Sequence, residues 1–291
     1  MSQKLDALLK QLHKLHPKYI DLSLDRLRKL LEKLNNPHLK LPPVIHIAGT
    51  NGKGSTLSFI QNILIENNYT IHAYISPHLK SFNERIIIRN KLINKKILYS
   101  VLKRIKKINN NEPITFFEIT TAAAFMLFQK SRSEFLVLET GLGGRLDATN
   151  IIPKKLCSII TPISFDHQEY LGKTIKNITK EKLGIIKNSD FILISNQKKE
   201  VKEFIKNKLV KKKNVYFYGG NYNINKIGNY SFEFRFGKEI RKISRPKLNG
   251  LHQLENASVA LAFSELLKKK NFKLNLLKTN KAIKNTSWPG R

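Results

Sequence analysis

A chain of 291 residues with 41% hydrophobic residues can bury a substantial core, as one large α/β domain or two modest ones. The single cysteine excludes a disulfide framework and suits a reducing cytoplasm, and no apolar run reaches the ~18 residues of a membrane span. The net charge of +32 favours anionic partners, but the lysines are spread along the whole chain without a recognisable nucleic-acid module. We therefore expect a cytoplasmic protein with neither a nucleic-acid partner nor a membrane, whose positive charge would help to attract anionic substrates.

The elements in chain order predict an α/β fold. Residues 1–34 have the pattern of two basic amphipathic helices, and short apolar runs then predict buried strands that alternate with helical periodicity. The strands are expected at 44–48, 71–75, 135–138, 156–161 and 191–195, and the intervening helices at 97–108, 115–129 and 175–186. This alternation predicts a P-loop-type, mostly parallel sheet flanked by helices. Residues 215–245 alternate apolar and polar side chains and predict a small antiparallel hairpin region, before a helix over 250–267 and no further element.

The turn that follows the first strand predicts a phosphate site. In V-I-H-I-A-G-T-N-G-K-G-S-T, residues 44–56, three glycines let several backbone N–H groups face one anion, and the next helix adds its partial positive charge. Lys53 would reach the terminal phosphates of a nucleotide, while Ser55 or Thr56 would offer a hydroxyl near magnesium. The pattern departs from G-x-x-x-x-G-K-S/T, because Gly54 separates Lys53 from Ser55. The alternative is a glycine-rich connection that binds nothing.

Polar side chains follow three other predicted strands. Glu139, at the end of a buried strand, is placed to hold magnesium directly or through water, and His167 is a candidate metal ligand beside Asp166. Loops at the carboxyl ends of parallel strands hold ligands in open α/β sheets. The loop after the second strand therefore adds further candidates, which are Ser76, His78, Glu84 and Arg85.

Several residues keep two interpretations at this point. Phe116 and Phe117 begin a helix and fit either a plain core or the wall of a pocket for a flat ligand. Lys182 stands in an apolar helical turn, where a solvated face is the default interpretation for so basic a chain. Arg145 and Asp147 lie in a glycine-containing loop and are candidates for substrate contact.

The motifs together resemble the folylpolyglutamate synthase and dihydrofolate synthase family, within the Mur ligase superfamily. The resemblance rests on G-T-N-G-K-G-S-T at 49–56, S-P-H-L and N-E-R-I within 76–86, T-F-F-E at 115–118 and E-T-G-L-G-G-R-L-D-A-T-N at 139–150. It continues with D-H at 166–167, E-K-L-G-I-I-K at 181–187, G-L-H-Q-L-E-N-A at 250–257 and W-P-G-R at 288–291. One departure is Leu183, where the family usually has alanine.

The resemblance implies a role for each matching position. The nucleotide-binding residues would be Asn51, Gly52, Lys53, Gly54, Ser55, Asn256 and Arg291. Ser76, Glu139 and His167 would hold Mg²⁺, and Lys182 matches the lysine that the family carbamylates. Lys53, His167 and Lys182 would form the catalytic group. The pterin substrate would lie among Asp21, Leu22, Ser23, Phe116, Phe117, Glu118, Ile119, Leu146, Asp147 and Ala148.

The implied activity is ATP-dependent addition of L-glutamate to dihydropteroate or to folyl(poly)glutamate through an acyl phosphate. We expect residues 1–291 to form the N-terminal ATP-binding ligase domain of a monomer, without the family's C-terminal domain, and to turn over little on their own. Another Mur-superfamily amide ligase would share the phosphate loop but not T-F-F-E or the A-T-N segment. A non-catalytic nucleotide-binding module would keep Lys53 and tolerate loss of Glu139.

Overall fold

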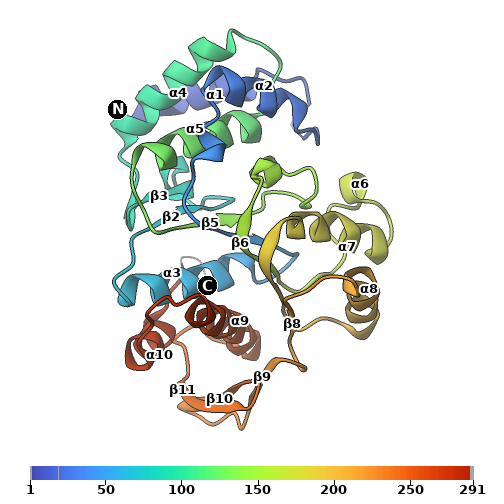
Figure 1. Cartoon of the computed structure of the whole chain (residues 1–291). Coiled ribbons are helices and arrows are strands. Elements are labelled where there is room, and N and C mark those ends of the chain that lie inside the picture. The colour runs from blue at the N-terminus through green and yellow to red at the C-terminus, as the bar shows by residue number, and fades with distance from the viewer. Residues whose placement is uncertain (1, 19, 289–291) are drawn as a thin grey trace. The chain divides into compact units, whose positions relative to one another are not determined.

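The computed structural model describes residues 2–18 and 20–288, which fall into two compact units (Figure 1). Unit 1 comprises residues 1–44 and 70–153, and unit 2 comprises residues 45–69 and 154–291. Residues 45–69, which contain the phosphate loop and the helix after it, therefore belong to unit 2, although the segments before and after them belong to unit 1.

Unit 1 combines four helices with four short strands. The helices are α1 (Ser2–His13), α2 (Asp25–Lys33), α4 (Lys95–Asn109) and α5 (Phe116–Lys130). The strands are β2 (Ile71–Tyr74), β3 (Ile86–Ile88), β4 (Lys91–Leu92) and β5 (Phe135–Glu139), and 3-10 turns cover Pro37–Leu39, Phe82–Arg85 and Ala148–Ile151. Strand β2 pairs in parallel with β5 and antiparallel with β3, which pairs antiparallel with β4.

The core of unit 1 lies between its helices. Helix α1 has one buried apolar face, formed by Leu5, Leu8 and Leu12. Helix α2 has a similar face, formed by Leu27, Leu30 and Leu31. Helix α5 is buried on nearly all sides, and in Figure 1 the helices α1, α2 and α4 are drawn around it. Thr115 and Glu118 form a capping box that fixes where α5 begins.

Unit 2 contains a parallel and an antiparallel sheet. The parallel strands are β1 (Val44–Ala48), β6 (Lys155–Ile160), β7 (Ser189–Ile194) and β8 (Val215–Phe217), paired in that order. The antiparallel strands are β9 (Tyr222–Asn225), β10 (Ser231–Phe236) and β11 (Glu239–Ser244). The helices are α3 (Lys53–Glu66), α6 (Gln168–Leu171), α7 (Ile175–Leu183), α8 (Lys199–Leu209), α9 (Leu251–Lys269) and α10 (Leu276–Asn285), with a 3-10 turn at Gly184–Ile186. Helix α3 packs against α9 and α10, which Figure 1 shows beside it.

The predicted fold class is confirmed, with differences at particular elements. The antiparallel region begins at Tyr222, because residues 215–217 form the parallel strand β8. Residues 86–92 form the antiparallel pair β3–β4, which was not predicted, and Arg89 and Asn90 both have positive φ at its turn. Helix α8 and the final helix α10 were not predicted. No helix of the described residues is both long and apolar enough to cross a membrane.

Candidate active site

The phosphate loop joins β1 to α3 in unit 2 and is anchored at its first residues. The backbone N–H groups of Thr50 and Asn51 both donate to the carbonyl oxygen of Pro162, at 2.9 and 3.1 Å. The Thr50 hydroxyl donates to the carbonyl oxygen of Ser164 at 3.0 Å, and the Asn51 amide donates to the Ser164 hydroxyl at 3.3 Å. The loop after β6 therefore fixes the start of the phosphate loop and leaves the glycines beyond it to turn toward the helix.

The three glycines of this loop have no room for a side chain, and a Cβ on Gly49 would lie 1.9 Å from Oγ1 of Thr161. Gly52 has a φ of +78°, and a Cβ there would lie 2.5 Å from Oδ1 of Asn256. A Cβ on Gly54 would lie 2.8 Å from Cζ2 of Trp288. Asn256 and Trp288 therefore pack directly against the backbone at the start of α3, where the first N–H groups of a helix are available to an anion. Asn256, which is buried, is held by a 3.1 Å bond from its amide to Gln253.

Two lysines meet at one backbone oxygen beside the loop. The ammonium group of Lys53 donates to the carbonyl oxygens of Gly49 and Thr50, at 3.0 and 3.3 Å. Lys182 donates to the same Gly49 oxygen at 3.0 Å and has only 2% of its surface exposed. The expectation of a solvated face for Lys182 is wrong, because the last turn of α7 carries this side chain inward, next to the phosphate loop.

Two strand-end residues of unit 1, Ser76 and Glu139, lie together and are described within that unit. Glu139 ends β5, is 5% exposed, and accepts the backbone N–H of Ser76 at 3.1 Å. The Ser76 hydroxyl oxygen is buried and has no hydrogen-bond partner among the described residues. A buried hydroxyl beside a buried carboxylate is the type of oxygen pair that magnesium accepts as ligands.

The same kind of hydroxyl occurs in unit 2. Thr56, in the first turn of α3, is fully buried, and its side-chain oxygen lacks a partner among the described residues. His167 precedes α6 with a φ of +44°, and its Nε2 lies 3.4 Å from Oδ1 of Asp166. Within the described residues, no three His, Cys, Asp or Glu side chains gather as a metal site of their own. The predicted Mg²⁺ ligands are divided between the units, with Ser76 and Glu139 in unit 1 and His167 in unit 2.

The segments predicted around the pterin substrate all belong to unit 1. Arg26, in the first turn of α2, bonds to Asp21 through Nη1 at 3.0 Å and to Glu118 through Nε at 3.2 Å. Glu118 is 3% exposed, and its Oε2 also accepts the N–H of Thr115 at 2.8 Å. Its other oxygen, Oε1, is buried without a partner among the described residues. The structure thus brings together two segments about ninety residues apart in the sequence.

The paired aromatics at the start of α5 have different surroundings. Phe116 stacks on His13 with ring centroids 3.6 Å apart, and Phe82 meets its edge at 5.5 Å. Phe117 is half-buried and lies against the backbone of Gly141, where a Cβ would be 2.5 Å from its ring. Phe116 therefore belongs to the core. Phe117 keeps surface beside the loop after β5, and its role in a pocket wall stays a prediction.

Asp147 organises that loop from within. Its carboxylate accepts the N–H groups of Leu142 at 2.8 Å and Thr149 at 2.9 Å, and also the Thr149 hydroxyl. Burial raises the pKa of the Asp147 carboxyl, and these hydrogen bonds oppose the shift. The side chain thus fixes the positions of its neighbours Leu146, which is half-buried, and Ala148, which is buried. Leu22 and Ser23 are half-buried before α2, Ile119 is buried in α5, and Arg291 lies outside the described residues.

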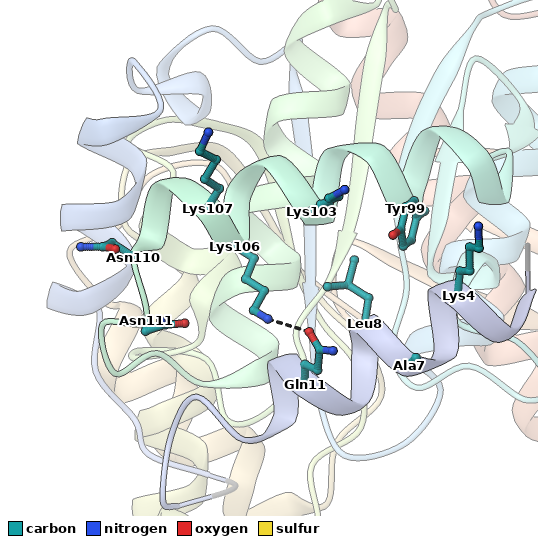
Figure 2. Close-up of a pocket in the computed structure, with 10 residues that line it drawn as sticks. All are labelled: Lys4, Ala7, Leu8, Gln11, Tyr99, Lys103, Lys106, Lys107, Asn110 and Asn111. Atoms are coloured by element: carbon teal, nitrogen blue, oxygen red, sulfur yellow. Dashed lines mark hydrogen bonds between the residues drawn. The ribbon is translucent and has the colours of Figure 1, made fainter.

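A groove between α1 and α4 is separate from the predicted site residues. It has a volume of about 710 Å³, and Lys4, Lys103, Lys106 and Lys107 line it together with Tyr99 (Figure 2). The Lys106 ammonium donates to the Gln11 side chain at 2.6 Å across the groove. None of the residues predicted to bind nucleotide, metal or pterin belongs to its lining.

Comparisons with known proteins identify the family of this chain. The family model for the Mur ligase middle domain matches residues 47–264, which include the phosphate loop, His167, Lys182 and Asn256. The chain belongs to the Mur ligase family. Within this family, a dihydrofolate synthase/folylpolyglutamate synthase from Bacillus subtilis is 32% identical over 284 residues, which cover 92% of this chain and 65% of the relative.

Solved structures of Mur ligase family members have the same fold. E. coli FolC in complex with DHPP and ADP superposes with a TM-score of 0.87 at 28% identity, and covers 99% of this chain and 67% of its own. A bifunctional folylpolyglutamate synthase/dihydrofolate synthase with Mn, AMPPNP and L-glutamate bound gives a TM-score of 0.83 at 27% identity, with coverages of 99% and 67%. The chain spans less than two thirds of the length of the curated relatives it matches.

Proposed function

We propose that the whole protein is an ATP-dependent carboxylate–amine ligase that adds L-glutamate to dihydropteroate, to folyl(poly)glutamate, or to both. The observation that carries the proposal is the phosphate loop, in which Gly52 and Gly54 leave no room for side chains and Lys53 lies beside Lys182. The relatives add the substrate class, since they are named dihydrofolate synthase/folylpolyglutamate synthase. A related complex holds DHPP with ADP, and another holds L-glutamate with AMPPNP.

The reaction would begin with transfer of the terminal phosphoryl group of ATP to the carboxylate of the pteroyl substrate. Charge spreads over the transferring oxygens, so the chain's task is to neutralise and align that charge rather than to exchange protons. The loop N–H groups and Lys53 would do this on one side of the phosphates. The amine of glutamate then attacks the acyl carbon, the amide bond forms, and inorganic phosphate leaves with the oxygen that came from the carboxylate.

The proposed Mg²⁺ ligands are Ser76, Glu139 and His167. The buried, unpartnered hydroxyl of Ser76 and the buried carboxylate of Glu139 support this assignment, because both are hard oxygen ligands. When bound, Mg²⁺ would neutralise charge on the phosphate oxygens. The Mn in the related AMPPNP complex supports a divalent cation in this family. Asp166, at 3.4 Å from Nε2 of His167, would orient that imidazole.

Lys182 would act as a carbamate. Two ammonium groups at the Gly49 oxygen place like charges close together in a site where one of them is buried. The Lys182 ammonium would first lose a proton, and the free amine would then add to CO₂ and release a second proton. The product carries a negative charge in place of the positive one and would attract Lys53.

The pterin ring would lie in unit 1 between the segment before α2 and the start of α5. The half-buried ring of Phe117 offers an apolar face for a flat heterocycle, and the half-buried Leu22 and Leu146 offer aliphatic contacts. The unpartnered Oε1 of Glu118 would accept a hydrogen bond from an amino group or ring N–H of the substrate. Asp147 would hold the loop that carries Leu146 and Ala148.

The test is ADP release by the full-length protein. With ATP and Mg²⁺ present, we expect release that requires both L-glutamate and either dihydropteroate or a tetrahydrofolate. Release that is equally fast without any pterin, or that requires a cell-wall precursor in its place, would overturn the proposed substrate class. Cell-wall precursors are the discriminating probe, because other amide ligases of the superfamily share the phosphate loop.

A further inference from the structure

Among the described residues, Arg26 connects the Asp21 segment to Glu118 by hydrogen bonds, and the role proposed for it rests on the function proposed above. Its guanidinium donates from Nε to Oε2 of Glu118 at 3.2 Å and from Nη1 to Oδ2 of Asp21 at 3.0 Å. Its Nη2 donates to the backbone oxygen of Asp21 at 2.9 Å. The three nitrogens of the planar guanidinium thus donate to two segments, and both segments are predicted to surround the pterin. We propose that Arg26 is a positioning residue for the pterin-binding wall.

The contacts of Glu118 explain what Arg26 would position. Oε2 of this buried carboxylate accepts hydrogen bonds from Nε of Arg26 and from the backbone N–H of Thr115. The bond from Thr115 belongs to the capping box of α5. With one oxygen fixed from two directions, the carboxylate cannot rotate freely, and Oε1 keeps a single orientation. Oε1 is the oxygen without a partner among the described residues. Arg26 therefore determines where the acceptor for the substrate lies without touching the substrate itself.

Arg26 also fixes the segment before α2. Asp21 accepts two hydrogen bonds from Arg26, one at its carboxylate and one at its backbone oxygen. Nε2 of His16 lies 3.4 Å from the same carboxylate. This holds residues 21–23 at a set distance from the start of α5. A lysine could replace one of the bonds but not the planar fork, because its ammonium is a single point of charge.

Packing of α2 does not depend on these bonds. Leu27, Leu30 and Leu31 are buried on the opposite side of the helix from solvent and join the core of unit 1. The Arg26 side chain keeps 23% of its surface exposed. Loss of the guanidinium should therefore displace Glu118 and Asp21 locally and leave the fold in place.

The experiment compares Arg26→Gln with Arg28→Gln in the full-length protein. Arg28 is the matched control, because it lies on the same helix and pairs with Asp25 on the exposed surface, at 2.8 Å. We expect Arg26→Gln to raise KM for dihydropteroate by roughly tenfold or more, since small displacements of positioning groups have large effects. The KM for ATP and kcat at saturating substrate should stay within about twofold of the wild-type values. The thermal midpoint should stay within a few degrees of that of wild type. Arg28→Gln should change none of these values.

Two further variants decide between geometry and charge. Arg26→Lys should remain impaired in KM for dihydropteroate, because the fork is lost while the charge is kept. Glu118→Gln should raise the same KM, and the double variant should be no worse than the more impaired single one, since both act through one carboxylate. A wild-type KM in Arg26→Gln or in Arg26→Lys would overturn the inference, as would an equal loss of kcat and of affinity for ATP. Failure of the proposed function would appear as a lack of pterin-dependent turnover by the wild-type protein. Failure of the inference would appear as an unchanged KM in the Arg26 variants of an active protein.

Discussion

Lys53 and Lys182 donate to the same carbonyl oxygen, that of Gly49, and each nitrogen is 3.0 Å from it. The two nitrogens thus lie within about 6 Å of each other, where two positive charges repel appreciably in a partly buried site. One lysine comes from the first helical position after the phosphate loop and the other from the last turn of α7. Conversion of Lys182 into a carbamate would turn this repulsion into attraction.

The carbamate leads to the first prediction. Lys182→Gln should reduce kcat of the full-length protein by ~100-fold or more, because both the negative charge and its contact near the loop are lost. Lys180→Gln, on the exposed side of the same helix, should leave kcat unchanged. With ¹³C-labelled bicarbonate, wild type should show a carbamate signal by carbon NMR that Lys182→Gln lacks. The same signal in both proteins would assign the carbamate to another lysine and contradict this role.

A second prediction concerns Gly52. Gly52→Ala should cost more stability than the ~1 kcal/mol of a left-handed alanine, because its Cβ also meets the Asn256 side chain. Gly237→Ala is the matched control, with a φ of +60° and open space around the added Cβ. We expect a larger fall in thermal midpoint for Gly52→Ala, together with weaker binding of ADP. Equal midpoints in the two variants would show that the contact with Asn256 is not restrictive.

The third prediction tests Glu139 as a metal ligand. Glu139→Gln can keep the bond from the Ser76 N–H but removes the negative charge, so kcat should fall by ~100-fold or more while the thermal midpoint changes little. Higher Mg²⁺ concentrations should recover part of the activity. Glu134→Gln, at the exposed approach to the same strand, serves as the control. Undiminished ligation by Glu139→Gln would remove this residue from the metal site.

The fourth prediction is a loss of stability in mild acid. Burial lowers the pKa of His46 well below its ordinary value, and the Lys155 charge lowers it further, while burial also lowers the pKa values of His38 and His72. The unfolded chain therefore binds protons below pH ~6.5 that the folded chain does not, and each such histidine costs up to ~1.4 kcal/mol per pH unit. The free energy of unfolding should fall between pH 7 and pH 5.5, and His46→Gln should flatten this slope. A stability that rises over the same interval would contradict the burial of these side chains.

The sequence predicted the elements whose signals are local. The glycine spacing of residues 49–54 indicated the phosphate loop, and apolar runs indicated five of the strands that the structure contains. Helix α8 was missed because its many lysines obscured the apolar spacing of Val201, Ile205 and Leu209. Helix α10 has a similar composition, and its start is marked only by the Asn275 cap.

The parts of the site that escaped prediction depend on tertiary contacts. Lys182 is buried because α7 packs it beside the phosphate loop, which no property of residues 175–183 alone reveals in so basic a chain. Arg26 was not singled out, since its partner Glu118 stands ninety-two positions away. The only local signal was a cation three residues after Ser23. The roles assigned to the remaining site residues stay predictions for the experiments above.

The central claim is that the substrate carboxylate becomes an acyl phosphate before glutamate attacks. The most direct test supplies dihydropteroate or a folate labelled with ¹⁸O in its reacting carboxylate, with ATP, Mg²⁺ and L-glutamate, to the full-length protein. Mass spectrometry of the released inorganic phosphate should then find one ¹⁸O atom per phosphate, transferred from the carboxylate. Amide formation that releases only unlabelled phosphate would contradict the proposed reaction.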